Sequence, residues 1–182
     1  MMTLKAAKTI LAEADLLYNT AKIEQAYIHL AAQINQDLAE TNPLILVAMN
    51  GGLIPAGQLL PRLTFPFTLD YLHPTRYQEE TSGGELVWHK RSNENLKGRV
   101  VLIIDDILDE GYTLSAMVED CLKYQPQQIF TAVLTQKDHQ RGNQFKANFI
   151  GLSVQDRYIF GCGMDYKGYW RQLNQIYAVK GL

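Results

Sequence analysis

The stretch 99–114 constrains the fold of this chain more than any other. After Arg99 come five apolar residues without polar alternation, the pattern of a strand that is buried on both faces of a parallel sheet. The polar residues and glycine that follow are Asp105, Asp106, Asp109, Gly111 and Thr113. From Leu114 onward, apolar residues recur at helical spacing. The pattern predicts a buried strand, an acidic turn, a glycine-containing loop and a helix.

This arrangement suits a phosphorylated ligand. Open α/β sheets bind ligands at the carboxyl ends of their strands, and a helix N-terminus offers free N–H groups to a phosphate. The carboxylates of Asp105 and Asp106 can accept hydrogen bonds from ribose hydroxyls, and they favour a Mg²⁺ ion that also holds substrate phosphates. We therefore expect a sugar phosphate and a divalent cation here.

Three other interpretations fit less well. A phosphate loop of the Walker A type requires Gly-Lys-Ser/Thr after its glycines, and the stretch has none. A calcium loop requires oxygen ligands where Ile107 and Leu108 stand. A solvated acidic turn is the simplest alternative, but the preceding strand is too apolar to lie at a surface.

The whole stretch resembles the phosphoribosyl pyrophosphate (PRPP) motif of type I phosphoribosyltransferases, which is an apolar strand, two acids, two apolar residues and Asp-x-Gly-x-Thr. Within that family it is most similar to the bacterial hypoxanthine-guanine enzymes. Two positions depart from the family pattern. Glu110 stands where Thr or Ser is usual, so its charge must point away from a phosphate, and Tyr112 stands where many members have Lys.

The resemblance implies an α/β fold with a central, mostly parallel, twisted sheet flanked by helices and a small hood region. Residues 1–182 would form a single domain, in which the N-terminal helices and the C-terminal segment contribute the hood over a purine site. The expected helices are 3–18 and a second one capped by Thr20, and the expected strands beside the central one include 44–49, 67–72, 128–136 and an edge strand at 176–179.

Composition excludes several other classes of protein. The chain of 182 residues is 47% apolar with a net charge of -2, which argues against a nucleic-acid or membrane surface. Cys121 and Cys162 are far apart, and we expect buried thiols in a reducing compartment. Glu13 and Asp15 interrupt any N-terminal hydrophobic run, so no signal peptide or spanning segment is expected and the protein should be cytoplasmic.

A second glycine turn follows the strand 44–49 as Asn50-Gly51-Gly52. Two glycines allow a backbone to approach an anion closely, although an ordinary tight turn would have the same pattern. The resemblance implies the pyrophosphate loop of the family, in which the peptide can be cis and many members have a basic residue where Asn50 stands.

The polar segment 73–84 contains two adjacent glycines and lies between apolar strands. It is either a plain mobile hairpin or a functional lid. The resemblance implies the flexible loop that closes over the active site, with Arg76 and Tyr77 as ligand contacts.

Residues beyond the strand 128–136 would recognise the base. Lys137 leaves a buried strand on the ligand side of the sheet and matches the lysine that purine enzymes place on the oxygen at C6. His139 and Arg141 are expected at a loop surface. The segment 158–166, which could also be a core strand with a hairpin, would stack Tyr158 on the purine and hydrogen-bond it through the backbone of Ile159.

By resemblance, Asp165 is a metal or base-edge ligand and Arg171 lies near pyrophosphate, although an arginine can equally form a surface ion pair. The implied metal ligands are Asp105, Asp106 and Asp165, with Mg²⁺ as the cofactor. The implied PRPP and phosphate contacts are Asp105, Asp106, Asp109, Glu110, Gly111, Tyr112, Thr113, Asn50, Gly51, Gly52 and Arg171.

The implied reaction joins PRPP to hypoxanthine or guanine and yields the nucleoside monophosphate and pyrophosphate, with Asp109 as the catalytic base. A preference for xanthine is one alternative. Another is a regulator that keeps the fold and binds nucleic acid, but the modest net charge and the joint presence of Asp109, Lys137 and Arg171 favour the enzyme. The resemblance also implies a homo-oligomer, a dimer or tetramer.

Overall fold

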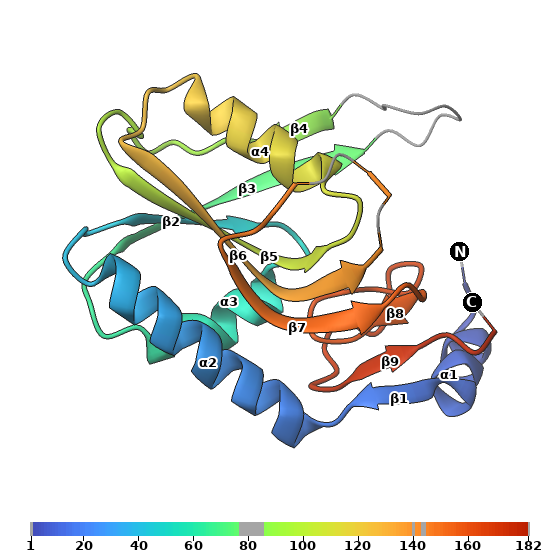
Figure 1. Ribbon diagram of the computed structural model, residues 1–182. Helices are drawn as coiled ribbons and strands as arrows, with labels where there is room; N and C mark the ends of the chain where they lie inside the picture. The colour runs from blue at the N-terminus through green and yellow to red at the C-terminus, as the bar shows by residue number, and fades with distance from the viewer. Residues whose placement is uncertain (1, 77–85, 140, 143–144, 182) are drawn as a thin grey trace.

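The computed structural model describes residues 2–76, 86–139, 141–142 and 145–181. A six-stranded sheet has the order β4-β3-β2-β5-β6-β7, and a three-stranded sheet has the order β1-β9-β8 (Figure 1). The strands are β1 (Asp15–Tyr18), β2 (Leu44–Ala48), β3 (Thr68–Arg76), β4 (Leu86–Lys90), β5 (Val100–Leu108), β6 (Gln128–Asp138), β7 (Phe149–Gln155), β8 (Ile159–Phe160) and β9 (Ile176–Ala178). The helices are α1 (Leu4–Glu13), α2 (Thr20–Leu38), α3 (Leu53–Leu59) and α4 (Tyr112–Leu122), with a 3₁₀ turn at Leu60–Arg62.

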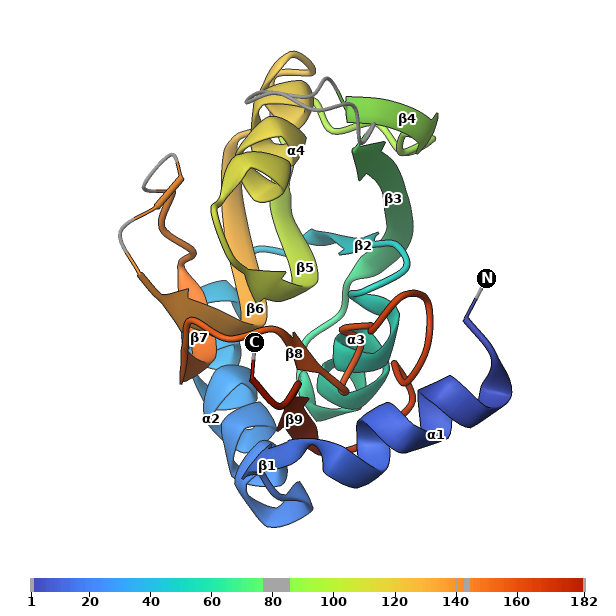
Figure 2. The same ribbon diagram turned by 90° about the vertical axis from the view of Figure 1, so that its right-hand side faces the viewer.

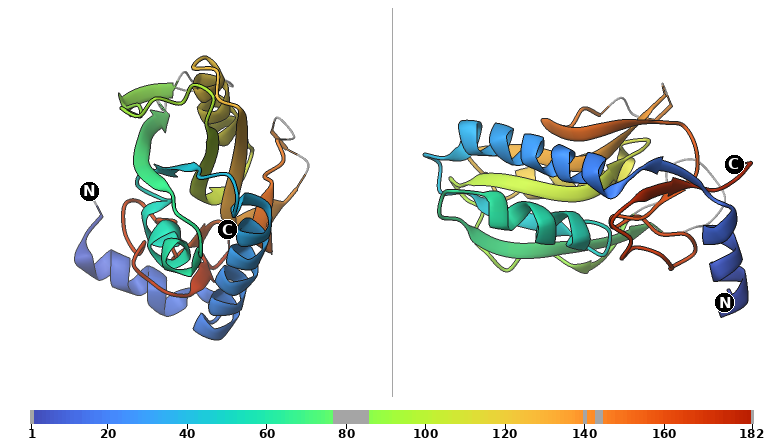
Figure 3. Two further views of the ribbon diagram at one scale, coloured as in Figure 1. Left: turned by 90° about the vertical axis from the view of Figure 1, so that its left-hand side faces the viewer. Right: turned by 90° about the horizontal axis from the view of Figure 1, so that it is seen from below.

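The predicted α/β architecture is confirmed. In the large sheet β3, β2, β5, β6 and β7 run parallel, and only β4, among the described strands, is antiparallel to its neighbour. Every residue of β2 and the first five of β5 are buried, because helices cover both faces of the sheet. Seen from below, α2 and α3 lie side by side across one face (Figure 3), and α4 covers the other.

The small antiparallel sheet forms a hood beside the carboxyl ends of the parallel strands (Figure 2). It joins distant parts of the sequence, since β1 comes from the N-terminal region and β8 and β9 from the C-terminal region. Its own apolar cluster contains Phe160, Tyr166 and Val179. This sheet therefore covers the edge of the large sheet at which ligands bind in open α/β folds.

The prediction of one helix over 3–18 is wrong. α1 ends at Glu13, Ala14 is extended, and Asp15–Tyr18 pairs with β9. Long-range contacts fix this strand: the Tyr18 hydroxyl donates to the Ser153 carbonyl at 2.7 Å, and the Asp15 carboxylate pairs with Arg157 at 2.7 Å. Tertiary pairing has overridden the helical preference of an Ala- and Leu-rich segment.

Other boundaries also differ from the predictions. The cap of α2 is Asn19, whose side-chain oxygen accepts the backbone N–H of Lys22 at 3.0 Å, and not Thr20. β9 lies between β1 and β8 and is not an edge strand. β3 continues to Arg76, so the first part of the expected lid is a strand.

The predicted acidic turn is also wrong, because Asp105 and Asp106 lie inside β5. The strand keeps pairing with β6 as far as Leu108, opposite Gln136. Backbone hydrogen bonds thus carry both acids to the carboxyl edge of the sheet on a rigid strand. The true turn begins three residues later, at Asp109.

The two cysteines are free and buried, as expected of thiols that pack in a core. Cys121 lies on the inner face of α4, and Cys162 joins the cluster beneath α2 and α3. Over the described parts of the chain, the helices are all too short or too polar to cross a membrane.

Candidate active site

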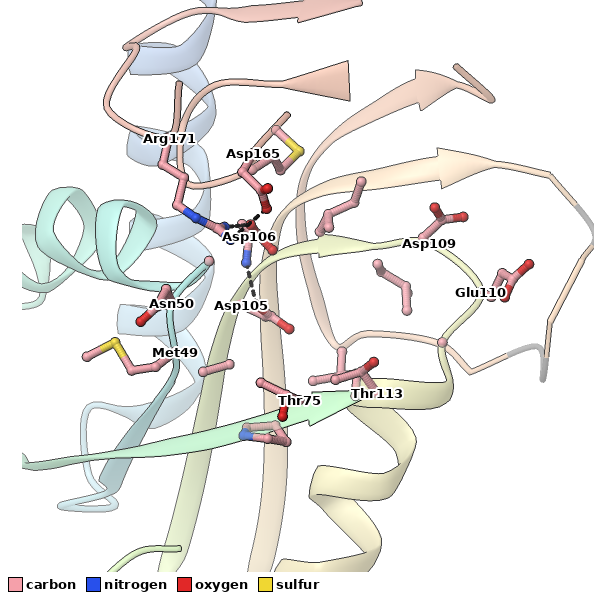
Figure 4. Close-up of a pocket in the computed structure, with 18 of the residues that line it drawn as sticks. Met49, Asn50, Thr75, Asp105, Asp106, Asp109, Glu110, Thr113, Asp165 and Arg171 are labelled. Carbon is pink, nitrogen blue, oxygen red and sulfur yellow. Dashed lines mark hydrogen bonds and ion pairs between the residues drawn. The ribbon is translucent and has the colours of Figure 1, made fainter. Parts of the chain in front are cut away.

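A cavity of about 560 Å³ opens at the carboxyl ends of β2, β3, β5 and β6, under the hood. Its volume is typical of small-ligand sites. Polar groups gather along its walls, among them three aspartates from β5 and the turn after it. Figure 4 shows Arg171 and Asp165 above Asp106, while Asp109 and Glu110 lie further along the same chain segment. The cavity therefore has two distinct polar regions.

The turn after β2 comes very close to β5. A Cβ atom at Gly51 would overlap the carboxylate of Asp106, so only glycine permits this approach. The Met49–Asn50 peptide is cis, and it lies in the turn for which the resemblance allowed that configuration. The turn presents its backbone to the cavity beside the acid pair.

Asp105 and Asp106 form the first polar region. Oδ1 of Asp105 accepts the backbone N–H of Asp106 at 2.9 Å. Burial raises the pKa of both carboxyls, and the neighbouring charge of Asp106 raises that of Asp105 further. Arg171 acts in the opposite direction, with Nη1 3.9 Å from Oδ2 of Asp106. The acid pair thus lies where an additional positive charge would be stabilising.

Arg171 is held by the hood and reaches toward this pair. Its Nη2 lies 2.6 Å from Oδ1 of Asp165, and its Nη1 donates to the Gly163 carbonyl at 2.6 Å. The other oxygen of Asp165 accepts the backbone N–H of Gly168 at 2.5 Å. Arg171 is therefore a partner of two cavity acids and not of a surface acid.

Asp109 forms the second polar region, and its pKa is shifted in the opposite direction to those of Asp105 and Asp106. Partial burial acts to raise its pKa, but hydrogen bonds from Lys137 and His139 outweigh burial and hold the pKa below its usual value. Lys137 Nζ lies 2.6 Å from Oδ2, and His139 Nε2 lies 2.7 Å from Oδ1. Each carboxylate oxygen of Asp109 thus has its own partner.

The turn after Asp109 leads into the N-terminus of α4. Gly111 caps α4 with φ 81°, a left-handed conformation that glycine adopts without steric cost. Among the described residues, the cap position supplies no side-chain hydrogen bond to the helix. A helix N-terminus favours an anion, and that of α4 lies at the wall of the cavity. Thr113 lines the cavity at this point.

The hood supplies an aromatic ring and a strand backbone. Tyr158 is 44% exposed and packs edge-on against Tyr166, with ring centroids 5.3 Å apart. Ile159 begins β8 and pairs with Ala178. Both Tyr158 and Ile159 line the same cavity as Lys137, so a flat ring could lie between them.

Most of the residues predicted from the sequence therefore gather in this one cavity. Those that line it are Asn50, Gly51, Asp105, Asp106, Asp109, Glu110, Gly111, Thr113, Lys137, Tyr158, Ile159, Asp165 and Arg171. Gly52 caps α3 behind the turn, and Tyr112 is 46% exposed at the start of α4. Arg76 ends β3. Tyr77 and the rest of the expected lid, through residue 84, lie outside the described residues.

The sequence interpretation gave some residues of this region no role of their own. His73, Pro74 and Thr75, which it placed in the lid segment 73–84, line the cavity from β3. His139 is not at the loop surface as expected: its side chain is 8% exposed and contacts Asp109. A signal was present, because Lys137 and His139 are two residues apart in an extended segment and so face the same side. Arg141 does lie at the surface, paired with Asp156 at 2.7 Å.

The donor chemistry of the first polar region suits a hard divalent cation. Asp105 and Asp106 offer only oxygen ligands, and their cationic neighbour Arg171 remains 3.9 Å from Asp106. A second acidic group is less suitable. Among the described residues, Asp109, His139 and Asp156 place their ligand atoms within 4.8 Å of one another. There Lys137 already supplies the positive charge, 2.6 Å from Asp109 and 3.7 Å from Asp156.

Comparison with known proteins agrees with this geometry. The family model for the phosphoribosyl transferase domain matches residues 13–167. The chain is 30% identical to a hypoxanthine-guanine phosphoribosyltransferase of Bacillus subtilis over 90% of this chain and 92% of that one. It is 28% identical to a hypoxanthine-guanine-xanthine phosphoribosyltransferase of Tritrichomonas foetus, over 90% of each.

A solved structure has the same fold. A hypoxanthine phosphoribosyltransferase of Staphylococcus aureus superposes with a TM-score of 0.87 at 23% identity, covering 94% of this chain and 95% of that one.

Proposed function

This chain belongs to the phosphoribosyl transferase family, and we propose that it transfers the 5-phosphoribosyl group of PRPP to hypoxanthine or guanine in purine salvage. The products are the nucleoside monophosphate and pyrophosphate. The relatives described above are named for these bases. We propose the same 6-oxopurine specificity for this chain because Lys137 and Asp109 lie in contact in its cavity.

One observation carries the proposal: a carboxylate and an ammonium group touch each other in the cavity, beside the N-terminus of α4. Lys137 Nζ is 2.6 Å from Oδ2 of Asp109. From Asp109 the turn runs through Glu110 and Gly111, and α4 begins at Tyr112. A proton acceptor, a donor for a purine oxygen and a phosphate site thus adjoin one another.

In the proposed reaction, the purine ring nitrogen N9 forms a bond to C1′ of the ribose while the bond from C1′ to the pyrophosphate oxygen breaks. The pyrophosphate leaves with the electron pair. Asp109 accepts the proton that the imidazole ring of the purine loses, or holds it at N7. The N-terminus of α4 binds the 5′-phosphate.

In this proposal, Arg171 and the turn 50–52 bind the pyrophosphate. Asp105 and Asp106 accept hydrogen bonds from the ribose hydroxyls. An arginine suits phosphate oxygens because its guanidinium can donate two parallel hydrogen bonds. When Mg²⁺ is bound at Asp105, Asp106 and Asp165, it supplies positive charge to the departing pyrophosphate. Tyr158 stacks on the purine, and the backbone of Ile159 hydrogen-bonds its edge.

Lys137 selects the base, because its ammonium group can donate to an oxygen at position 6 and not to the hydrogens of a 6-amino group. Xanthine is a second candidate substrate, since the Tritrichomonas foetus relative is named for all three oxopurines.

An activity panel tests the proposal. Purified protein with PRPP and Mg²⁺ is offered hypoxanthine, guanine, xanthine, adenine or orotate, and nucleotide and pyrophosphate are both measured. We expect turnover with hypoxanthine and guanine and little with adenine or orotate. Asp138→Asn is the matched control for the active-site aspartates, because Asp138 is exposed at the end of β6. Turnover with orotate or adenine alone would contradict the proposed specificity.

We also propose that residues 1–182 work as one domain, whose hood covers the purine, and that the chain forms a homo-oligomer. Large apolar side chains exposed on β3, Leu69 and Tyr71, support an association between subunits. Sedimentation velocity tests the assembly, and a monomer at micromolar concentration would contradict it.

A further inference from the structure

His139 contacts Asp109, the proposed general base, yet the reaction described above gives His139 no role. It follows β6, one residue beyond the end of the strand, and its side chain is almost fully buried. A buried imidazole against a carboxylate in a cavity is a frequent feature of catalytic sites.

The hydrogen bonds of the ring define its protonation. Nδ1 accepts the backbone N–H of Arg141 at 3.1 Å, so Nδ1 carries a lone pair. The proton of the neutral ring is therefore on Nε2, which lies 2.7 Å from Oδ1 of Asp109. His139 therefore donates from Nε2 to Oδ1 of Asp109.

The two oxygens of Asp109 are thus held in different ways. Oδ1 is bound by His139, which is fixed at its other nitrogen by the backbone, while Oδ2 is bound by Lys137, a flexible side chain. The other charged groups that face this cluster are Asp156, 3.7 Å from Lys137, and Arg141, which pairs with Asp156. Asp109 has two side-chain contacts, to Lys137 and to His139. In the proposed function, only Lys137 also binds the purine.

We propose that His139 is a positioning residue, which holds Oδ1 of Asp109 so that Oδ2 faces the purine once Lys137 moves to the oxygen at position 6. The inference rests on the proposed function. Binding of the purine oxygen at position 6 then frees Asp109 to act. The purine gains the contact with the Lys137 ammonium group, and Oδ2 of Asp109, which Lys137 has left, accepts the proton from the purine ring.

Two substitutions at His139 separate this role from simple packing. His139→Phe keeps a planar ring of similar bulk and removes the donor, whereas His139→Gln places an amide N–H close to the position of Nε2. Without the donor, the carboxylate form of Asp109 is less stable, so the acidic limb of the kcat profile should move to higher pH by about one unit. kcat for hypoxanthine at neutral pH should fall about tenfold, because the carboxylate is no longer oriented.

The KM for PRPP should change less than about twofold, since the contacts of His139 are to Asp109 and not to the phosphate sites, and His139→Gln should recover most of kcat. Asp138→Asn, in the same segment but exposed, should match the wild type. An unchanged kcat and acidic limb in a folded His139→Phe variant would overturn the inference while the wild-type activity left the proposed function intact. Equal losses in the Phe and Gln variants would also overturn it.

A second measurement needs neither turnover nor a variant that folds. Among the imidazole N–H protons of the wild-type protein, observed by ¹⁵N-edited NMR, one should exchange slowly with water, because the Nε2–H of His139 is buried against Asp109. If none of the four histidines has a ring N–H protected from exchange, His139 does not hold Asp109. Failure of the proposed function would appear separately, as a wild-type protein that uses none of the oxopurines.

Discussion

The acid pair and Asp109 lie on one chain segment only a few residues apart, yet their environments act in opposite directions. Asp106 is buried and Asp105 is partly buried beside it, and burial raises the pKa of both carboxyls. Asp109 is partly exposed, and Lys137 and His139 lower its pKa. In the proposed function, the same residue type therefore binds a cation at one place and serves as an ionised base at the other.

The difference also divides the work of the site. The acid pair is rigid because it lies within β5 and its partner groups are backbone and Arg171. Asp109 lies in the turn, where its partners are side chains. A binding site benefits from fixed ligands, whereas a base must exchange one partner for the proton it accepts. Perturbing each region separately should therefore give different kinds of loss.

Removal of divalent cations should have the largest effect. Because Arg171 remains 3.9 Å from Asp106, PRPP and two carboxylates would repel each other in one pocket. We expect turnover to be lost in excess chelator and restored by Mg²⁺, as measured by pyrophosphate release. Undiminished turnover in chelator would show that Arg171 alone neutralises the region.

Asp109→Asn should come next. The substitution keeps the shape of the side chain and removes the proton acceptor, and general acid–base assistance is typically worth about 10²–10⁴-fold. kcat should fall by roughly that factor, while the Kd for PRPP, measured by calorimetry, should change little because the backbone of α4 is intact. A large loss of PRPP affinity would instead assign Asp109 to substrate binding, as for the acid pair.

Much of this comparison was predictable from the sequence. The apolar run, the acids and the glycine lie in one continuous segment, so local pattern was enough to place Asp105, Asp106 and Asp109 at a sheet edge. Lys137 was predictable for the same reason, as the residue that leaves a buried strand.

What could not be predicted depends on pairing between distant segments. Asp105 and Asp106 lie inside β5 only because β6 continues to pair with that strand, and 15–18 is a strand only because β9 lies beside it. The burial of His139 requires the turn after β5 to meet the segment after β6. No local periodicity encodes that meeting, although the two-residue spacing from Lys137 was a usable sign.

Lys137→Gln should have an intermediate effect. A hydrogen bond to a charged group is worth about 1.5–3 kcal/mol, so the use of hypoxanthine and guanine relative to adenine should fall about ten- to hundredfold. Loss of the ammonium group should also raise the pKa of Asp109 in the free enzyme and move the acidic limb of the kcat/KM profile to higher pH. Steady-state kinetics with the three bases provides the measurement. An unchanged ratio of oxopurine to adenine use would place Lys137 outside the base pocket.

The smallest effect should be on stability, and it should differ in sign between the two regions. In the protein without cation and PRPP, Asp105→Asn removes one of two adjacent, poorly solvated carboxyl groups while its amide oxygen still accepts the N–H of Asp106. A gain of about 1 kcal/mol would raise Tm by roughly 2–4 °C for a chain of this size. Asp109→Asn removes ion-pair contacts of a partly exposed group, and we expect a loss of about 1 °C.

The dependence of stability on pH follows from the directions of these two pKa shifts. A carboxyl whose pKa is raised by folding favours unfolding as pH rises from its unfolded value toward its folded value, so the gain from Asp105→Asn should be present at neutral pH and vanish in acid. A carboxyl whose pKa is lowered stabilises the fold above its unfolded value, and that contribution is lost as pH falls through the folded value. Calorimetric scans across the acid-to-neutral range in chelator, with Asp138→Asn as the exposed control, measure both slopes. If both variants lose stability at neutral pH, the acid pair is already neutralised in the free protein, and the contrast between the two regions is one of position rather than charge.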